Sequence, residues 1–473
     1  MLKAAGAALE PTRRTHPVKV CLILAVSLLM TVSLTLFGET IGWHFVLAGA
    51  LFFFGTAVLV LMRNIVRKMI YAIFLLQMTA SYLMQASLMV TIAGVLLFVP
   101  ILLVSEGTGR ISSIPCRTPL TLMLLGWLSS IFYVTIFGYS SRGYTMLYDV
   151  HLLLGFGLVY MIFCLIQLKH LDVDRLLFCV SLSGLVLVGL TVAKYITNGH
   201  AALMFAGRFG MSVNINPNLL AMYVGLTFPP SIFIALHEKR SVTKKALMYA
   251  VSVVYAAVFF MTASRGSLFG LSAVALYIIW SKRSASIFAG ALTAAVIAYF
   301  TVGKNMIVRI FNPTSNDILS NFGRVELLRS AFDILKDNYY MLGIGMNNFA
   351  AHKLDYGFPF FFDRNGTLSS HNLYVEMWLG WGILGLIGWV LFNGWIIYAL
   401  FCSSRNEKYR CASQGIAFAM IAYMLHGLVD SCIAGFSIMF TYFTLVGIAL
   451  YIVTRKNQDA ALTNASQSLS GQR

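Results

Sequence analysis

The residues best suited to chemistry are a few basic side chains at the ends of long apolar runs. Arg265 lies in the short segment Thr262-Ala-Ser-Arg-Gly-Ser267 between two such runs, where Gly266 allows a tight reversal. A guanidinium there is suited to bind phosphate oxygens in a bidentate manner, as an anionic lipid-linked substrate would require. The same position also suits an arginine whose side chain only reaches the polar headgroups of a bilayer. The sequence leaves both interpretations of Arg265 open.

Arg208 lies in a similar place, in Ala206-Gly-Arg-Phe-Gly210, shortly before another apolar run. That run opens with Asn216 and Pro217, a helix N-cap and a favoured first helical residue. The N-terminus of a helix adds partial positive charge that attracts an anion. Helix capping explains the asparagines here, including Asn218, but it does not explain the arginine. Arg208 is therefore a second candidate for binding an anion.

Histidines and acids complete the candidates. His371 lies in Ser369-Ser-His-Asn-Leu-Tyr374, where a polar segment returns to an apolar run, and a lone histidine there is more often structural than catalytic. His426 and Asp430 are four residues apart at the end of a run, a spacing that favours a hydrogen-bonded pair holding helices together. The D-x-D pair Asp172-Val-Asp174 is interpreted as a solvated loop. No zinc-binding, Walker A, dinucleotide-binding or serine-hydrolase motif occurs, and the seven cysteines form no CxxC pair.

The elements that must position these residues are membrane-spanning helices. Of the 473 residues, 59% are hydrophobic and 11% are charged, whereas soluble domains are about a quarter charged. This composition excludes a soluble, fibrous or disordered protein and predicts an all-α, polytopic membrane protein. Runs of about 20 apolar residues suggest about fourteen spans, with about twelve as the alternative. The runs lie near 20–37, 43–62, 69–86, 88–104, 119–137, 149–168, 176–194, 217–236, 246–263, 267–280, 284–302, 373–401, 412–430 and 432–454.

The basic residues predict the orientation of these spans. If the N-terminus is cytoplasmic, 23 of the 34 basic residues but only 7 of the 17 acidic residues fall in the inner connections. The positive-inside rule requires such an excess of Lys and Arg in cytoplasmic loops. We therefore expect both termini in the cytoplasm and the candidate residues on the outer side. The net charge of +17 follows from this asymmetry and indicates no nucleic-acid partner, because the basic residues form short, scattered clusters.

One outer connection, residues 303–371, is much longer than the others and contains a short predicted amphipathic helix at 323–336. The predicted apolar side of this helix is formed by Val325, Leu328, Phe332 and Leu335. Structured loops of this length are usually functional. We expect one transmembrane domain over 1–473. It would comprise N-terminal spans at 1–200, a motif-bearing catalytic region at 200–430 that includes the large loop, and a cytoplasmic tail at 457–473, which we expect to be disordered.

Taken in order, these motifs resemble those of the bacterial superfamily of O-antigen ligases and O-antigen polymerases. They are Gly207-Arg-Phe-Gly210 with Asn216-Pro-Asn218, Ser264-Arg-Gly266, Gly323-Arg324, Gly343-Ile-Gly345, His371-Asn372 with Tyr374, and Gly382-Ile-Leu-Gly385. Their order and spacing cover residues 200–430, whereas the N-terminal half resembles the family only in its apolar spans. Two positions depart from the pattern. Met341 replaces a proline that often precedes the Gly-Ile-Gly turn, and Gly380 replaces an acidic residue, with Glu376 one turn earlier.

The resemblance implies a glycosyltransferase that works without a metal or other cofactor, inverts the transferred sugar, and acts at the periplasmic face of the bacterial inner membrane. Its donor would be a glycan linked to undecaprenyl diphosphate, and Arg208 and Arg265 would bind the diphosphate. His371 would contact or deprotonate the acceptor hydroxyl as a general base. The further candidates for substrate contact are Arg324, Asn372, Tyr374, Asn218, His426 and Asp430.

Ligase and polymerase share these motifs, so the acceptor stays open. A ligase would transfer the glycan to lipid A–core, and a polymerase would transfer it to a second lipid-linked repeat unit. We place the ligase first for the shape of the motif set. A transporter or flippase is the alternative from another class, and it would be expected to bear ionisable groups near the middle of the membrane, or broken helices in paired halves. Apart from these glycolipids, the expected partners are membrane lipids.

Overall fold

The computed structural model describes residues 71, 117–137, 142–167, 169, 171–200, 208–213, 216–237, 241–282, 315–346, 348–353, 355–356, 369–431 and 436–470. All of them belong to one compact unit, formed by residues 71–91 and 112–473. Within these ranges the regular structure is helical, and no strand is present. The spans predicted at 20–37, 43–62, 69–86, 88–104 and 284–302 lie outside the described residues, apart from Tyr71.

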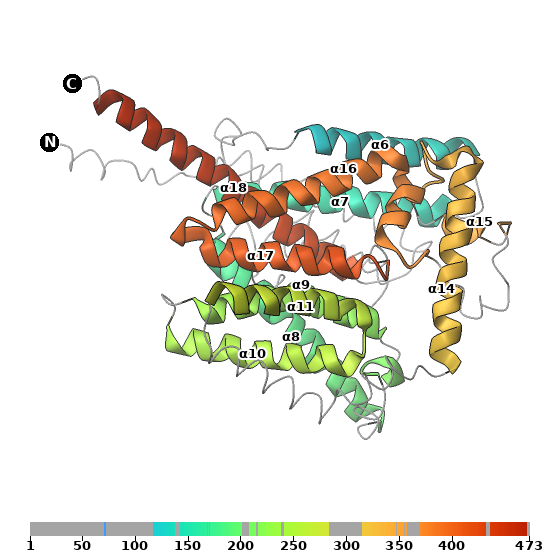
Figure 1. Ribbon diagram of the computed structural model, residues 1–473, viewed down its shortest axis with the longest axis horizontal. Helices are drawn as coiled ribbons and strands as arrows, with labels where there is room; N and C mark the ends of the chain where they lie inside the picture. The colour runs from blue at the N-terminus through green and yellow to red at the C-terminus, as the bar shows by residue number, and fades with distance from the viewer. Residues whose placement is uncertain are drawn as a thin grey trace, which may run out of the picture. The chain divides into compact units, whose positions relative to one another are not determined.

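The remaining predicted spans are helices (Figure 1). These helices are α6 (Arg117–Phe137), α7 (Arg142–Gln167), α8 (Val173–Thr197), α9 (Pro217–Leu236), α10 (Val242–Thr262), α11 (Arg265–Lys282), α16 (Leu373–Ser403), α17 (Glu407–His426) and α18 (Phe436–Ser470). Their ends differ from those of the apolar runs most of all at the start of α7 and at the end of α18. The shorter elements are η4 (Met211–Val213), α14 (Ser315–Ile334), a π-helical turn η6 (Leu335–Tyr339) and α15 (Phe349–His352).

Five of the described helices are long and apolar enough to cross a membrane, namely α8, α9, α10, α16 and the 438–456 part of α18. Shorter apolar helical segments at 118–132, 155–167 and 268–281 belong to α6, α7 and α11. The chain is therefore a polytopic membrane protein, as its composition predicts. The total of about fourteen spans stays a prediction.

Small residues let these helices pack closely. Helix α16 packs against α6, and α11 packs against α17. Gly126 of α6 faces Gly385 of α16 so closely that a β-carbon on Gly126 would overlap the backbone of Gly385. On α11, a β-carbon at Gly270 would overlap Ala422 of α17. Close approach through small residues is the usual way in which membrane helices associate.

Helix α16 is broken near its first third, where Gly382 has φ 67° and ψ −175°. The turn that follows α14 fills the break: the Ile344 N–H donates to the Leu379 carbonyl (2.6 Å), and the Ile383 N–H donates to the Tyr340 carbonyl (3.0 Å). Glycine is required at Gly382 because its φ lies in the left-handed region and because a β-carbon would overlap the Met341 carbonyl. The run predicted at 373–401 is thus one broken helix, which hydropathy alone does not reveal.

Helix α14 is longer than the predicted helix at 323–336, and its buried side is different. Val325 and Phe332, which were predicted to face the core, are 59% and 42% exposed. The helix packs through Leu327, Ala331 and Ile334, and of the predicted residues Leu335 belongs to the same core and Leu328 packs against it. The prediction was wrong for Val325 and Phe332, because two stripes of apolar residues recur at helical spacing. The stripe that contains the small Ala331 allows the closer approach.

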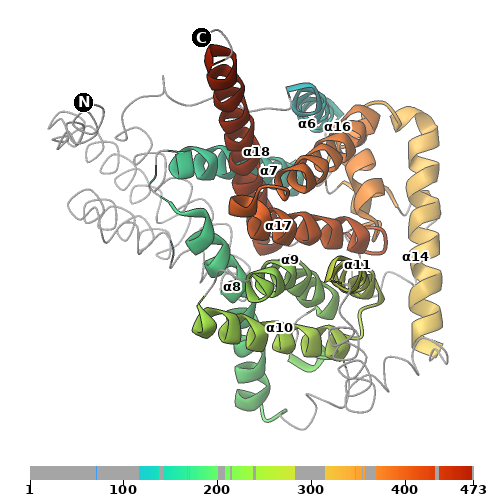
Figure 2. The same ribbon diagram turned by 60° about the vertical axis from the view of Figure 1, so that its left-hand side comes forward.

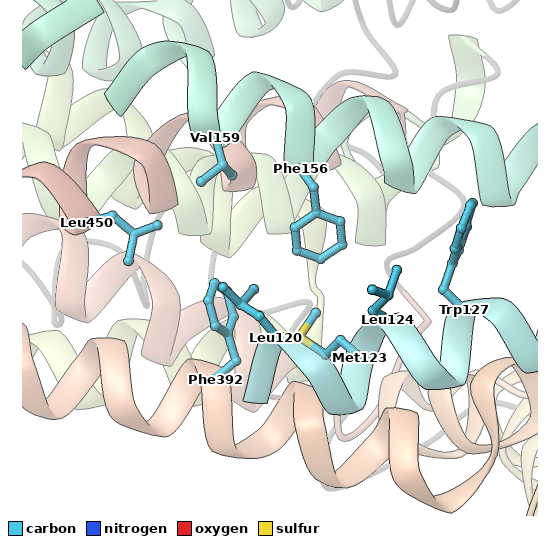
Figure 3. Close-up of a pocket in the computed structure, with 8 residues that line it drawn as sticks. All are labelled: Leu120, Met123, Leu124, Trp127, Phe156, Val159, Phe392 and Leu450. Atoms are coloured by element: carbon cyan, nitrogen blue, oxygen red, sulfur yellow. The ribbon is translucent and has the colours of Figure 1, made fainter. Parts of the chain in front are cut away.

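An apolar cavity of about 270 Å³ lies between α6, α7, α16 and α18 (Figure 3). Its walls are the side chains of Leu120, Met123, Leu124, Trp127, Phe156, Val159, Phe392 and Leu450. None of the candidate site residues lines it. A second difference from the sequence prediction concerns the tail after 456, expected to be disordered, where α18 continues as a helix to Ser470.

Candidate functional site

The candidate residues meet at one end of the helix bundle. Helices α9, α11 and α16 begin there and α17 ends there, while α14 lies across these helix ends (Figures 1 and 2). The sequence places the candidates at helix ends because each arginine or histidine immediately precedes or opens an apolar run. The structure brings most of them into one hydrogen-bonded cluster.

Asp430 is the centre of this cluster. It lies four residues beyond the end of α17, and its Oδ1 pairs with His371 Nδ1 (2.8 Å) and accepts from the Ser431 N–H (2.9 Å). Its Oδ2 accepts a hydrogen bond from the side-chain amide of Asn218 (2.7 Å) and lies 4.0 Å from a guanidinium nitrogen of Arg324. Burial by itself would raise the pKa of Asp430. The hydrogen bond from His371 and the positive charge of Arg324 outweigh burial and hold that pKa below its usual value.

His371 has one ring nitrogen bound by the protein and an imidazole that is reachable from solvent. Its Nδ1 faces the Asp430 carboxylate, and 29% of the side chain is exposed. A neutral histidine beside a carboxylate carries its proton on the nitrogen that donates to that carboxylate, which leaves Nε2 as an acceptor. The pair therefore has the arrangement of a general base oriented by an acid.

The start of α16 is fixed to the loop between α17 and α18. The Leu373 N–H donates to the Gly427 carbonyl (2.7 Å), and the side-chain amide of Asn372 donates to the Leu428 carbonyl (2.9 Å). The Asn372 side-chain oxygen caps the helix, and the Tyr374 hydroxyl donates to the Met424 carbonyl (3.0 Å). The structure thus gives Asn372 and Tyr374 positioning contacts, and their contact with a substrate stays a prediction.

Arg208 is held in place by two neighbouring segments. Its Nε donates to the Thr262 carbonyl (2.9 Å), and its Nη2 donates to the side-chain oxygen of Asn218 (2.6 Å). Because Asn218 also donates to Asp430, a continuous chain of hydrogen bonds joins Arg208 to His371. Asn218 itself lies in the first turn of α9, where the N-cap Asn216 accepts its backbone N–H.

Arg265 opens α11, two residues after the left-handed residue Ala263 that ends α10 (φ 48°). Its Nη2 donates to the side-chain oxygen of Asn321 on α14 (2.6 Å). The neighbouring Gly266 touches the loop of Asp430, since a β-carbon there would overlap Val429. This close approach brings the start of α11 against the loop that carries the carboxylate.

Arg324 reaches the same loop from α14. Its Nη1 donates to the Val429 carbonyl (3.3 Å), and 31% of its side chain is exposed. Of the three candidate arginines, Arg324 lies nearest the Asp430 carboxylate, Arg208 is linked to it through Asn218, and Arg265 bonds Asn321 on α14. The net positive charge of this group of residues suits an anion better than it suits a cation.

The expected pair between His426 and Asp430 is wrong. The Asp430 N–H donates to the His426 carbonyl (3.1 Å), but the Asp430 carboxylate binds His371 and Asn218 rather than the His426 ring. His426 is buried, and its Nε2 has no hydrogen-bond partner among the described residues. Its contact with a substrate stays a prediction.

The sequence analysis did not find every residue that the cluster uses. Asn321 and the link between His371 and Asp430 were missed, since contacts between segments far apart in sequence leave no local pattern. Within the described ranges, no three His, Cys, Asp or Glu side chains converge as a metal site requires. Asp172, of the D-x-D pair, caps α8 by accepting the Arg175 N–H.

The fold and this cluster define an integral membrane protein with a positively charged, histidine-containing site at one end of its helices. Residues 250–390 match the family model described as O-antigen ligase, so this part of the chain is an O-antigen ligase family domain. The resemblance inferred from the sequence is thereby confirmed. The domain includes Arg265, Arg324 and His371, whereas Arg208, Asn218 and Asp430 lie outside the matched residues.

A curated relative extends the similarity beyond this domain. The chain is 22% identical over 332 residues to the teichuronic acid biosynthesis protein TuaE of Bacillus subtilis (strain 168). The matched residues make up 65% of this chain. The matched part spans 66% of the length of that relative, just under two thirds.

Proposed function

We propose that the protein is a membrane glycosyltransferase that moves a glycan from undecaprenyl diphosphate to an acceptor hydroxyl, without a metal ion. The observation that carries this proposal is the contact between His371 and Asp430, at 2.8 Å, with Arg324 4.0 Å from the same carboxylate and Arg208 linked to it through Asn218. Family membership supports a lipid-linked glycan as the substrate. The diphosphate would lie against Arg208, Arg265 and Arg324, whose guanidinium groups suit phosphate oxygens.

The reaction is a single displacement. The acceptor oxygen attacks the anomeric carbon of the donor, its proton passes to Nε2 of His371, and the bond from that carbon to the diphosphate oxygen breaks. Undecaprenyl diphosphate leaves with the bonding electrons, and the sugar configuration is inverted. Asp430 stabilises the imidazolium that forms, and the arginines stabilise the charge that develops on the leaving diphosphate.

The site would face the periplasm. The positive-inside distribution of Lys and Arg supports this orientation, since it assigns the starts of α9, α11 and α16 to the outer side. A single cysteine at Ser315 should then react with an impermeant thiol reagent added to intact cells, and one at Ser241 should not. The reverse labelling pattern would place the site in the cytoplasm and overturn the proposal.

The acceptor divides the proposal into two candidates. Transfer to lipid A–core, the ligase reaction, is the first. Transfer to a second lipid-linked repeat unit, the polymerase reaction, is the second. A transporter gains little support, because the polar cluster lies at the helix ends rather than near the middle of the described spans.

The direct test uses the purified full-length protein with a synthetic undecaprenyl-diphosphate-linked oligosaccharide. Release of undecaprenyl diphosphate that depends on an acceptor would support a transferase, and the acceptor consumed would separate ligase from polymerase. We expect the rate to be unchanged by excess chelator. Loss of activity that magnesium or manganese restores would show that the arginines do not bind the diphosphate alone.

A further inference from the structure

The backbone at His371 has an unusual conformation for a residue with a side chain. Its φ is +54°, in the left-handed region that residues other than glycine seldom adopt. Such a conformation persists only where the surrounding contacts impose it. The contacts that impose it here also decide where the imidazole points.

On one side of His371, the chain is held by a buried carboxylate. The Ser370 N–H and the Ser370 hydroxyl both donate to Oε2 of Glu376, at 2.9 and 2.8 Å. Ser370 is fully buried, and Glu376 is 5% exposed. Glu376 lies in the first turn of α16, where a carboxylate also interacts favourably with the helix dipole.

On the other side, the chain is held by Asn372. The side chain of Asn372 accepts the backbone N–H groups of Tyr374 and Val375 and donates to the Leu428 carbonyl. His371 is therefore the single residue between two anchors, and Asp430 binds its ring at Nδ1. With both neighbours fixed, the backbone of His371 cannot relax to a negative φ without breaking one of the anchors.

We propose that Glu376 is a positioning residue for the base His371, acting through Ser370 to hold the imidazole against Asp430. The inference rests on the proposed function of His371 and extends it to a carboxylate that has no contact with substrate in the proposed reaction. An ordinary helix cap would need only the Asn372 side chain. The two hydrogen bonds from Ser370 to Glu376 instead fix the segment before the cap, which carries His371.

The main test compares variants of Glu376 in the full-length protein, with a synthetic undecaprenyl-diphosphate-linked oligosaccharide as the donor. Glu376→Ala removes both bonds and should lower kcat by about 10²-fold, as a misplacement of about 1 Å does. The KM for the donor should stay within about twofold, because the arginines are untouched. Glu376→Gln keeps an acceptor oxygen and should lose no more than about fivefold. A loss for Glu376→Gln equal to that for Glu376→Ala would overturn the inference.

A double variant shows whether Glu376 acts through the histidine. In a His371→Ala background, Glu376→Ala should change the residual rate by less than about twofold, since contacts that act as one unit are not additive. A further loss of about 10²-fold in that background would overturn the inference. Wild-type turnover by His371→Ala would instead refute the proposed base, and the inference would fall with it.

Two controls separate positioning from folding. Asn393→Ala removes a buried, hydrogen-bonded side chain from the same helix, far from His371 in sequence. It should lower thermal stability at least as much as Glu376→Ala does, with kcat unchanged. If Glu376→Ala does not accumulate, Ser370→Ala, which removes one of the two bonds, should still lower kcat by about three- to tenfold. An unchanged kcat for Ser370→Ala would overturn the inference.

Discussion

Helix α16 belongs to two regions of opposite chemistry. Where it begins, His371 and Asn372 lie beside a cluster centred on Asp430. The Asp430 carboxylate forms hydrogen bonds with Asn218, His371 and the Ser431 N–H. Farther along, Phe392 lines a cavity whose walls are all apolar side chains (Figure 3). A polar group within the membrane is costly, so charges concentrate at the helix ends. That is also where a lipid-linked diphosphate would lie.

Polar groups deep in the bundle behave differently from those in the cluster. The Tyr442 hydroxyl donates to the side-chain oxygen of Asn393 (2.6 Å), whose amide donates to the Trp389 carbonyl (2.8 Å). This pair is fully buried and holds helices together. In the cluster, by contrast, His371 and Arg324 keep about a third of their side chains exposed. Exposure, more than polarity, therefore separates the groups suited to chemistry from those that only join helices.

The largest effect expected is that of His371→Ala. A general base contributes about 10²–10⁴-fold to a rate, so transfer should fall by that factor while the protein still accumulates. The measurement is release of undecaprenyl diphosphate per folded molecule. His200→Ala is the matched control, because it removes the same side chain at the end of α8, outside the cluster. Equal losses in both variants would contradict a catalytic role for His371.

Asp430→Asn should give the next largest loss. The amide cannot hold the imidazole in the required tautomer, so we expect transfer to fall by about 10²-fold. Stability provides a second measurement, because the lowered pKa of Asp430 makes its contribution fully present above about pH 4. That contribution is lost as the pH falls through the lowered pKa.

The melting temperature of the wild type should therefore fall more steeply than that of Asp430→Asn as the pH falls below about 4. The variant should be the less stable of the two at pH 7, and the two curves should converge in acid. Parallel curves over this range would show that the carboxylate is not stabilised by its contacts with His371 and Arg324.

Arg265→Lys should have a smaller effect. Lysine keeps the charge and can still reach the headgroups, but it cannot bind phosphate oxygens with two parallel hydrogen bonds. We expect about a tenfold loss of transfer, the equivalent of one charged hydrogen bond. Arg329→Lys, on the exposed side of α14, is the matched control and should be neutral. Normal transfer by Arg265→Lys would support the alternative that Arg265 only anchors the helix end.

The sequence predicts the elements of this protein better than the contacts between them. Helix α9 was predicted at 217–236 because Asn216 and Pro217 mark its start locally. The break in α16 at Gly382 and the full buried side of α14 were not predicted, because both depend on which segment packs against the helix. Arg208, Arg265 and His371 could be chosen from residue type and position alone.

The partner of His371 could not be predicted. Asp430 is 59 residues away in sequence, and its four-residue spacing from His426 suggested a different pair. That pairing assumed a helix that continues to 430, whereas α17 ends at His426. An error of one turn in a helix end therefore assigned the carboxylate to the wrong histidine, which shows how strongly a site prediction depends on helix boundaries.

Phe392→Ala is expected to leave transfer unchanged. It tests the apolar cavity separately from the polar cluster. Phe392 is fully buried beside the cavity, so removing its ring enlarges an empty space that no polar group could fill. A buried Phe→Ala change costs about 3–5 kcal/mol of stability, which should appear as a lower melting temperature. Because the cluster and the cavity share helix α16 but no side chain, kcat per folded molecule at low temperature should stay within about twofold of the wild type. A tenfold loss of kcat would mean that packing around Phe392 sets the geometry at His371, and the two regions would then have to be treated as one.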